Sequence, residues 1–336
     1  MTAPGRERQL ALTALAGRAP SPHNIQPARW RFVGDSAELW EETARWLSVG
    51  DPGGRDNRIA LGMAWEGMTI ALSGESLRLA LESPAPAGYP PAQPGCRLVA
   101  RGRILPGAEA DPLLPSLATR SSYRGRFASA DSSRLRALDG CIASHRDIAC
   151  ALPESAARRV AEWYDLSAAE GLDSPAFARE LYSWMRFSRR DLRWTRDGLS
   201  ADCLCLSAFE AWGASVALMP TMVRVLAALS LTRLLVSEAN KVKGAARIVM
   251  IHASAGTDTF DAGRAWYRFW LDLDRAGIVG VPMSALSDSR RYSAEILAAW
   301  PLPYGRKLLN VMRLGPVPAA GAARSSRLPA VELLLE

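Results

Sequence analysis

Histidine, lysine and cysteine are scarce in this chain, and their scarcity limits the chemistry it can perform. The 336 residues include three histidines, and the five cysteines form an odd set without the spacing of a disulfide framework or a zinc site. Cys203 and Cys205 lie two apart in an expected helix, so their side chains should diverge. We therefore expect reduced thiols, no metal centre and a cytoplasmic location.

Long apolar runs and several well-known site motifs are also missing. The most apolar stretch, residues 211–223, contains Pro220 and is followed by Arg224, so it is too short to span a bilayer. The chain has no G-x-G-x-x-G or G-x-x-x-x-G-K-[ST] loop, no G-x-S-x-G of a serine hydrolase and no H-E-x-x-H of a metalloprotease. We expect no membrane partner and none of these sites.

Arginine, by contrast, is abundant. Of the 41 basic residues only Lys241, Lys243 and Lys307 are lysine, and with 34 acidic residues the net charge is +7. Guanidinium groups bind phosphate and carboxylate through paired hydrogen bonds, so a phosphorylated cofactor or an anionic substrate is favoured. The arginines are scattered singly, without the aromatic-interleaved basic stripe of a nucleic-acid site, which argues against nucleic acid as a partner.

The hydrophobic pattern indicates a mixed α/β fold of the α+β class. Helices are expected at 7–18, 56–72, 132–146, 153–170, 175–186, 200–219 and 263–276, and strands at 30–33, 96–104, 246–252 and 309–314. A loop is expected at 83–95, and an irregular apolar lid or partner surface at 220–245. A second unit begins near Asp111 and repeats the first at greater length, so we expect two domains, residues 1–110 and 111–336.

A first polar cluster follows the N-terminal helix at Ala19–Pro27. Its prolines fix a turn, while Ser21, His23, Asn24 and Gln26 supply short polar groups that can hydrogen-bond the edge of a planar heteroaromatic ring. A capped helix end followed by a polar loop is the alternative, and composition alone favours it.

A second cluster, Arg120–Arg124, places two guanidiniums and two serine hydroxyls within five residues, just ahead of a helix. This set suits a dianionic phosphate through charge-assisted hydrogen bonds of about 1.5–3 kcal/mol each. A solvated basic loop is equally consistent with this cluster alone. Arg324–Pro329 repeats the same residue types near the C-terminus, and a mononucleotide phosphate needs donors that converge from separate segments.

A third element is the stretch Gly277–Ala285, which follows the expected helix at 263–276. A glycine after that helix and Pro282 before Met283 would expose the backbone N–H groups of Ser284 and Ala285 to a ligand. An ordinary exit from a helix into a loop is the alternative.

The order of these clusters resembles the nitroreductase superfamily of FMN enzymes. That family shows a P-S-x-x-N-x-Q-P segment, an R-x-S-x-[KR] segment, a G-x-x-x-x-P exit and a terminal S-R-L-P, and all four occur here. In the family the FMN lies at a dimer interface, and this chain divides the matching segments between its halves. The resemblance implies a nitroreductase-like fold whose two related halves form a single-chain pseudo-dimer with helices around central sheets. It is similar in this to the fused, double-length branch that includes mycobacterial Acg-like proteins.

The resemblance also implies roles for individual residues. Arg120, Ser122 and Arg327 would bind the FMN phosphate, Arg124 would lie near the ribityl chain and the pyrimidine edge, and the N–H of Ser284 or Ala285 would face flavin N5. The residues implied in cofactor binding are Pro20, Ser21, Asn24, Arg120, Ser121, Ser122, Arg124, Pro282, Met283, Ser284, Ala285, Arg324, Ser325 and Arg327.

The sequence departs from the family pattern at two places. Ser325 stands where a basic residue is usual, two positions before Arg327, so Arg324 would have to compensate. Ala28 and Arg29 separate the Q-P pair from Trp30, so that loop would be shifted.

The activity implied by the resemblance is a two-step exchange of electrons. NAD(P)H would give a hydride to flavin N5, and a small electron-poor acceptor such as a nitroaromatic or a quinone would take the electrons. No side-chain general acid is identifiable. One alternative is an FMN-dependent dehydrogenase or oxidase of a specialised azoline or peptide substrate, and another is a non-catalytic FMN-binding or storage protein. The chain would be a monomeric pseudo-dimer or a homo-oligomer.

Overall fold

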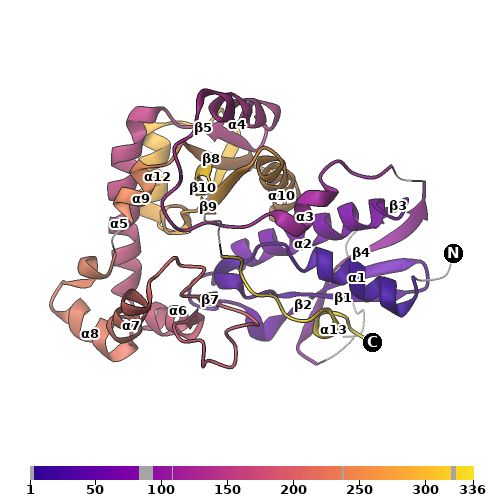
Figure 1. The fold of residues 1–336 in the computed structure, drawn as a ribbon, viewed down its shortest axis with the longest axis horizontal. Coiled ribbons are helices and arrows are strands. Elements are labelled where there is room, and N and C mark those ends of the chain that lie inside the picture. The colour runs from indigo at the N-terminus through magenta and orange to yellow at the C-terminus, as the bar shows by residue number, and fades with distance from the viewer. Residues whose placement is uncertain (1–3, 83–93, 108, 237, 319–322) are drawn as a thin grey trace.

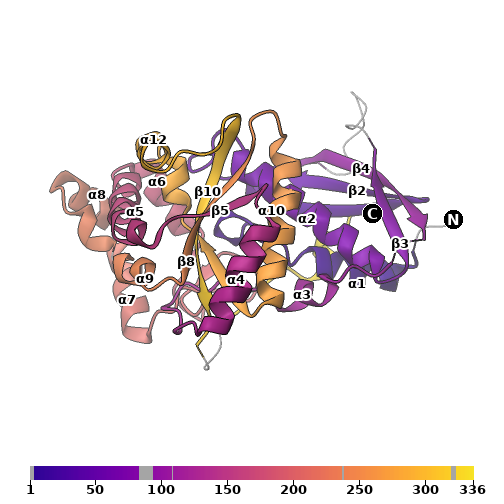
Figure 2. The same cartoon turned by 90° about the horizontal axis from the view of Figure 1, so that it is seen from above.

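The computed structural model describes residues 4–82, 94–107, 109–236, 238–318 and 323–336. Two four-stranded antiparallel sheets stand on either side of two long helices that face each other, α2 (Arg55–Ser73) and α10 (Thr259–Arg275). Figure 1 shows the half built on α10 beside the half built on α2, and Figure 2 shows both helices between the sheets. The expected mixture of helices and sheets is confirmed, whereas most of the expected loop at 83–95 lies outside the described residues.

The N-terminal half runs helix, two strands, helix, two strands. Its elements are α1 (Arg6–Ala16), β1 (Ala28–Val33), β2 (Ser36–Glu42), α2, β3 (Leu77–Leu81) and β4 (Cys96–Pro106), with the strand order β1-β2-β4-β3. The β1–β2 hairpin closes through a two-residue turn, Gly34–Asp35, in which Gly34 takes a positive φ of 59°. Such tight hairpin turns favour glycine because a side chain resists that conformation.

The C-terminal half repeats this order with insertions. Its framework is α4 (Ser132–Ser144), β5 (Ala149–Ala151), β8 (Arg247–Ser254), α10, β9 (Ile278–Pro282) and β10 (Arg306–Pro316), with the strand order β5-β8-β10-β9. Position by position, this order matches the order of the N-terminal sheet, and each half holds its long helix between its second and third strands along the chain. Helix α3 (Leu114–Thr119) joins the halves.

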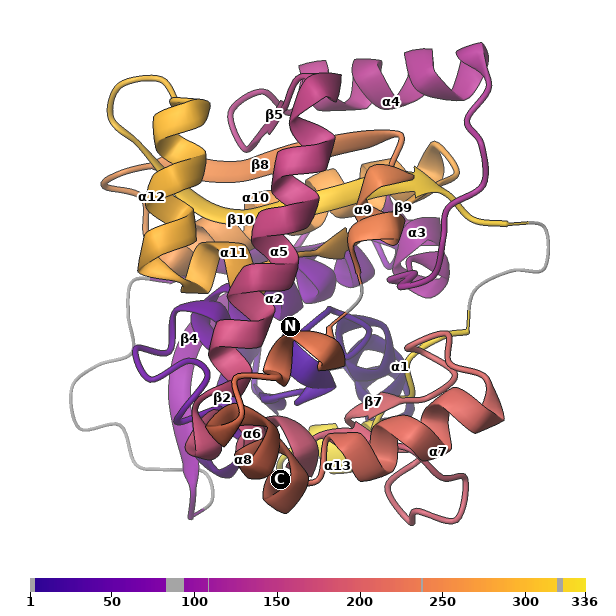
Figure 3. The ribbon, with the colours of Figure 1, turned by 90° about the vertical axis from the view of Figure 1, so that its left-hand side faces the viewer.

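Two insertions enlarge the C-terminal half. The first lies between β5 and β8 and contains α5 (Ala157–Leu172), α6 (Pro175–Ser183), β6 (Met185–Arg186), β7 (Leu199–Ser200), α7 (Ala208–Ala217), α8 (Pro220–Ala228) and α9 (Ala239–Lys243). The second lies between β9 and β10 and contains α11 (Ser284–Asp288) and α12 (Arg290–Ala299). In Figure 3, α5 runs from the C-terminal sheet down to α6, α7 and α8, which lie beside the N-terminal half.

Helices α2 and α10 cross at a pair of glycines that approach the facing backbone in a reciprocal manner. A Cβ added at Gly62 of α2 would overlap the carbonyl oxygen of Phe260, and one added at Gly263 of α10 would overlap the carbonyl oxygen of Ile59. Only glycine permits two helix backbones to come this close. Further along the seam, buried Glu66 accepts hydrogen bonds from Arg264 and Arg268 at 3.0 and 2.9 Å.

A C-terminal arm crosses from one half to the other. After β10 the chain continues through residues 323–329 to α13 (Ala330–Leu333), which lies against α1 in the N-terminal half. The N–H of Leu335 donates to the carbonyl of Trp30 in β1 at 2.7 Å, and Leu334 forms a parallel β-bridge with Trp30. The arm therefore extends the edge of the sheet in the opposite half.

Several sequence expectations are wrong in detail. Residues 220–245 are not irregular, because they form α8, a 3-10 turn at Thr232–Leu235 and α9. Cys203 and Cys205 lie in a turn ahead of α7, not in a helix. The stretch after the helix at 263–276 begins with strand β9, so the alternative of an ordinary exit into a loop does not hold either.

Among the described residues, no single helix is both long and apolar enough to cross a bilayer. Helices α7 and α8 meet the length and hydropathy criteria only as a pair, and that pair is bent by 68°.

Replacing Gly62 or Gly263 with alanine should destabilise the protein, because the new methyl group would force the two helix backbones apart. Overpacked cores lose about 1–3 kcal/mol, and we expect a loss of at least that size in the free energy of urea unfolding. The control is Gly140→Ala on the exposed side of α4, where a Cβ meets nothing within 4 Å. It should gain about 0.5–1 kcal/mol. Equal stability of all three variants would contradict the close crossing.

Candidate functional site

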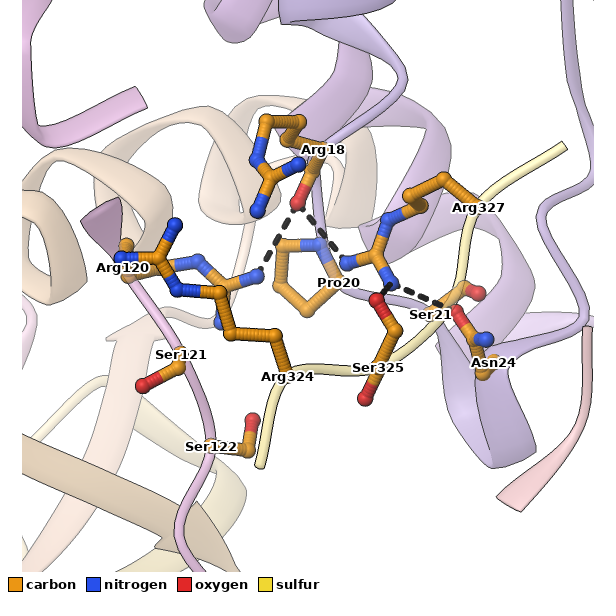
Figure 4. Close-up of a pocket in the computed structure, with 10 residues that line it drawn as sticks. All are labelled: Arg18, Pro20, Ser21, Asn24, Arg120, Ser121, Ser122, Arg324, Ser325 and Arg327. Atoms are coloured by element: carbon orange, nitrogen blue, oxygen red, sulfur yellow. Dashed lines mark hydrogen bonds between the residues drawn. The ribbon is translucent and has the colours of Figure 1, made fainter. Parts of the chain in front are cut away.

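A polar pocket of about 380 Å³ lies where the N-terminal half, the connection between the halves and the C-terminal arm meet (Figure 4). It is lined by Arg18, Pro20, Ser21, Asn24, Arg120, Ser121, Ser122, Arg324, Ser325 and Arg327. Segments around positions 20, 120 and 325 therefore converge, as the motifs predicted. An apolar hollow of about 280 Å³ shares Pro20 and Ser21 with this pocket.

The end of helix α1 holds two of the four arginines. The carbonyl of Arg18 accepts hydrogen bonds from Arg120 and from Arg327, each at 3.0 Å, and the carbonyl of Gly17 accepts one from Arg327 at 3.0 Å. Carbonyls at the C-terminal end of a helix are free of intrahelical partners and carry partial negative charge, so they attract cations. Figure 4 shows both guanidiniums turned toward the Arg18 carbonyl.

Positive charge in the pocket has no carboxylate to balance it. None of the ten residues that line the pocket is Asp or Glu. Arg120 is only 4% exposed, lies 4.9 Å from the centre of the Trp270 ring, and has no hydrogen-bond partner for Nε or Nη1 among the described residues. Burial, followed by repulsion from Arg120 and Arg18, lowers the pKa of Arg327 to about 9. An anion bound at such a cluster would stabilise the protein, because it would form charge-assisted hydrogen bonds with the guanidinium groups.

The P-S-x-x-N-x-Q loop is joined to two other parts of the chain through its two amides. Asn24 donates from Nδ2 to the carbonyls of Gly198 and Ser326, at 3.2 and 3.0 Å, and accepts from Arg327 at Oδ1. Gln26 donates to the carbonyl of Arg196 at 2.9 Å and accepts from the N–H of Leu328 at 2.8 Å. The amides thus join the loop to the first insertion and to the C-terminal arm.

This loop also has a strained backbone. His23, Asn24 and Gln26 have φ values of 46°, 57° and 51°, a left-handed conformation that costs non-glycine residues free energy. Asn24 and Gln26 are buried, so the hydrogen bonds described above hold the conformation in place. Strain of this kind persists where the surroundings over-determine it, which is common at ligand sites.

Arg124 does not line the pocket. Its Nη1 is buried without a partner among the described residues, and burial lowers its pKa. Burial, followed by the charge of Arg124, lowers the pKa of His23 to about 4, so this histidine is neutral at pH 7. Arg124 and His23 come from different halves, and Cys205 of the first insertion lies against the backbone of Arg124.

Residues 282–285 also lie away from the pocket. Pro282 ends β9, and the N–H of Met283 is used in a hydrogen bond of 2.7 Å to the carbonyl of Val311. Ser284 begins α11, and its hydroxyl accepts from Asn310 at 3.0 Å. The backbone N–H groups of Ser284 and Ala285 belong to the first turn of α11, where helical N–H groups have no intrahelical acceptor.

Sequence reasoning missed Arg18 as a pocket residue. Its position two residues before Pro20 was a usable signal. Ser325 stands where a basic residue is usual, and Arg324 was expected to compensate. Arg324 lines the pocket and donates to the carbonyl of Ala118 at 3.1 Å.

Comparison with known proteins supports the resemblance drawn from the motifs. A stretch of 70 residues is 39% identical to two provisionally named NAD(P)H nitroreductases from two strains of Mycobacterium tuberculosis. The match spans 21% of this chain and 20% of each relative, so about a fifth of the curated relatives is covered. The predicted likeness to the nitroreductase superfamily is confirmed at this level. No family model matches the chain.

Two solved structures show a distant likeness. The FMN-dependent nitroreductase NfnB of Mycobacterium smegmatis, in complex with NADPH, is 18% identical, with a TM-score of 0.35 over 65% of this chain and 89% of that chain. A provisionally named nitroreductase from Anabaena variabilis is 9% identical, with a TM-score of 0.42 over 84% of this chain and 69% of that chain. Scores this low carry no weight for the fold, which is defined by its own strand order and helix packing.

Inorganic phosphate should raise the melting temperature of the protein by binding the arginine pocket. A ligand that binds only the folded state adds about 2.7 kcal/mol at a hundred times its Kd. Arg120→Gln should abolish this gain while leaving the phosphate-free protein at least as stable, because it removes a buried, unbalanced charge. Arg103→Gln, which changes an arginine 56% exposed on β4, should keep the gain. An undiminished gain in Arg120→Gln would locate the anion elsewhere.

Proposed function

We propose that the chain binds one FMN in the arginine pocket and acts as an FMN-dependent NAD(P)H oxidoreductase of the nitroreductase type. The observation that carries this proposal is the convergence of four arginines and four serines, from segments about 100 and 200 residues apart, without a carboxylate. The names of the curated relatives, which describe NAD(P)H nitroreductases, support the same activity.

The residues present fit a phosphate-bearing cofactor. A phosphate dianion offers three acceptor oxygens, and Arg120 has two donor atoms without partners at the pocket. Ser121 and Ser122 add hydroxyl donors, and Arg18, Arg324 and Arg327 bring further charge.

Each segment has a distinct part in this proposal. Arg120, Ser122 and Arg327 would hold the phosphate, with Arg324 supplying the charge that Ser325 lacks. Pro20, Ser21 and Asn24 would contribute from the other half. Arg124 has a buried, unpartnered Nη1 and would supply positive charge beside the ring system. The backbone of residues 282–285 would complete the site.

The chemistry requires little acid–base catalysis from the protein. When bound, FMN supplies a ring that takes up a hydride at N5 and releases the electrons to an acceptor, here a nitroaromatic or a quinone. The arginines would orient the phosphate end and so fix the position of the ring, while the first insertion would exclude water. Because His23 would be neutral, it would add no charge of its own beside Arg124.

We further propose that residues 1–110 and 111–336 are related halves that form a pseudo-dimer within one chain. The identical strand orders and the reciprocal glycine contacts between α2 and α10 support this division. In this arrangement one site is complete, because residues 1–110 contain no arginine-serine segment and the P-S-x-x-N segment occurs once.

The purified protein should bind FMN in a 1:1 ratio and bind riboflavin, which lacks the phosphate, at least about tenfold more weakly. Loss of charge-assisted hydrogen bonds worth about 1.5–3 kcal/mol predicts that Arg120→Gln weakens FMN binding about ten- to a hundredfold. Riboflavin affinity should stay unchanged in the variant. Fluorescence titration measures all four constants, with Arg103→Gln as the control. Equal affinity of the wild type for both flavins would refute the phosphate assignment.

NADH or NADPH, added without oxygen, should bleach the visible absorption of the bound flavin, and a quinone or nitroaromatic should restore it. A second candidate function is FMN storage, which one observation favours. Hydrogen bonds from Asn24, Gln26 and Ser326 to residues 194–198 hold the first insertion over the site, and this cover would shield the flavin from nicotinamide. Bound FMN that neither nucleotide bleaches would favour storage over catalysis.

A further inference from the structure

A compact group of three metal-ligating side chains lies between α4 and α10, outside the arginine pocket. Cys141 is in the last turn of α4, His145 caps the end of that helix, and Asp272 is near the end of α10. The Cys141 Sγ and the His145 Nε2 lie 3.4 and 3.2 Å from the same oxygen, Oδ2 of Asp272. All three ligand atoms lie within 4.8 Å of one another.

These separations match the edges of a zinc coordination tetrahedron. Zinc binds thiolate sulfur at about 2.3 Å, imidazole nitrogen at about 2.0–2.1 Å and carboxylate oxygen at about 2.0–2.2 Å. At tetrahedral angles, such bonds hold neighbouring ligand atoms about 3.3–3.6 Å apart. The edge from Sγ to Oδ2, 3.4 Å, falls within this spacing, and the edge from Nε2 to Oδ2, 3.2 Å, lies just below it. The third edge, from Sγ to Nε2, is no longer than 4.8 Å.

The surroundings hold the three side chains in place. The N–H of His145 donates to the carbonyl of Cys141, and the carbonyl of His145 accepts from Ile148 and Ala149. Its ring packs against Phe269 with centres 5.4 Å apart. Arg275 holds the other oxygen of Asp272 at 2.8 Å, which turns Oδ2 toward the cysteine and the histidine. Outer contacts of this kind orient the ligands of metal sites.

We propose that Cys141, His145 and Asp272 bind a zinc ion, with water as the fourth ligand. The side chains of His145 and Asp272 are 22% and 17% exposed, which leaves room for the ion to enter and for a water to remain. Thiolate and carboxylate together balance the two charges of Zn²⁺, and the histidine binds as the neutral ring. The thiol proton leaves to solvent when the ion binds.

In the metal-free protein the same atoms form hydrogen bonds. Burial, followed by the charge of Asp272, raises the pKa of the Cys141 thiol, so the thiol keeps its proton until a metal displaces it. Sequence reasoning expected no metal centre because the chain has only three histidines and its five cysteines lack the spacing of a zinc site. The third ligand here comes from a helix 131 residues further along the chain, which spacing alone does not reveal.

Cobalt(II) added to the full chain after treatment with a chelator tests the site. We expect the visible bands of tetrahedral cobalt and a thiolate-to-cobalt charge-transfer band in the near ultraviolet. Cys141→Ser should remove the charge-transfer band and raise the Kd for zinc by at least about tenfold. Even the loss of a residue that only hydrogen-bonds to a metal ligand weakens metal binding by about ten- to a hundredfold. His145→Gln, at a more exposed position, should weaken zinc binding similarly and gives the same test if Cys141→Ser fails to fold.

The matched control is Cys150→Ser, because Cys150 lies on neighbouring β5 outside the cluster. It should keep both the charge-transfer band and the zinc affinity of the wild type. Absence of the band in the wild type, or its persistence in Cys141→Ser, would overturn the proposal. Neither result depends on flavin binding.

Discussion

The close crossing of α2 and α10 is the constraint on which the rest of the structure depends. Gly62 and Gly263 let the two backbones touch, and each helix supports the sheet of its own half. Helix α1 packs on α2, where a Cβ at Gly67 would lie 3.3 Å from Ala16, so the position of α2 sets the position of the α1 carbonyls. Helix α10 places Trp270 against Arg120. The pocket therefore straddles this seam, and its geometry follows from the crossing.

The C-terminal arm links the two halves of the chain. It leaves β10 in one half and ends against β1 in the other, and on the way it supplies Arg324, Ser325 and Arg327 to the pocket. Its register is fixed at both ends, by the contacts of Asn24 and Gln26 with residues 326–328 and by the bridge between Trp30 and Leu334. The strained φ values of the P-S-x-x-N loop are compensated by these same bonds. The pocket is therefore complete only when the arm lies in this position.

How much could be predicted from the sequence differs between the elements and the site. Long amphipathic or buried helices such as α2, α5 and α10 were found because their apolar residues recur over several turns. Strands β2 and β3 were not predicted. Strand β2 carries the buried charged residues Glu38 and Glu41, which interrupt its apolar pattern, and the turns that bound these strands are short. Helices α8 and α9 were taken for an irregular segment because nearly every residue there is apolar or basic, so no face stands out.

The grouping of the candidate site residues could be read from the sequence, for a physical reason. Nine of the residues expected to bind the cofactor line one pocket, because a phosphate demands arginine, serine and amide donors whose residue types can be read directly. Arg124 and residues 282–285 do not line it. Their expected parts depend on where backbone N–H groups and one guanidinium point, and residue type does not encode direction.

The charge of the pocket works against the stability of the protein without a ligand. A buried arginine whose folded-state pKa lies near 9, below its ordinary value of 12.5, is harder to charge in the folded than in the unfolded chain. The penalty is complete below pH 9 and falls only as the pH rises from 9 toward 12.5. No described carboxylate lines the pocket to offset it, and the carbonyls at the end of α1 offset it only in part. A dianion bound between the arginines would remove the penalty, so an anionic ligand in this pocket would stabilise the folded chain.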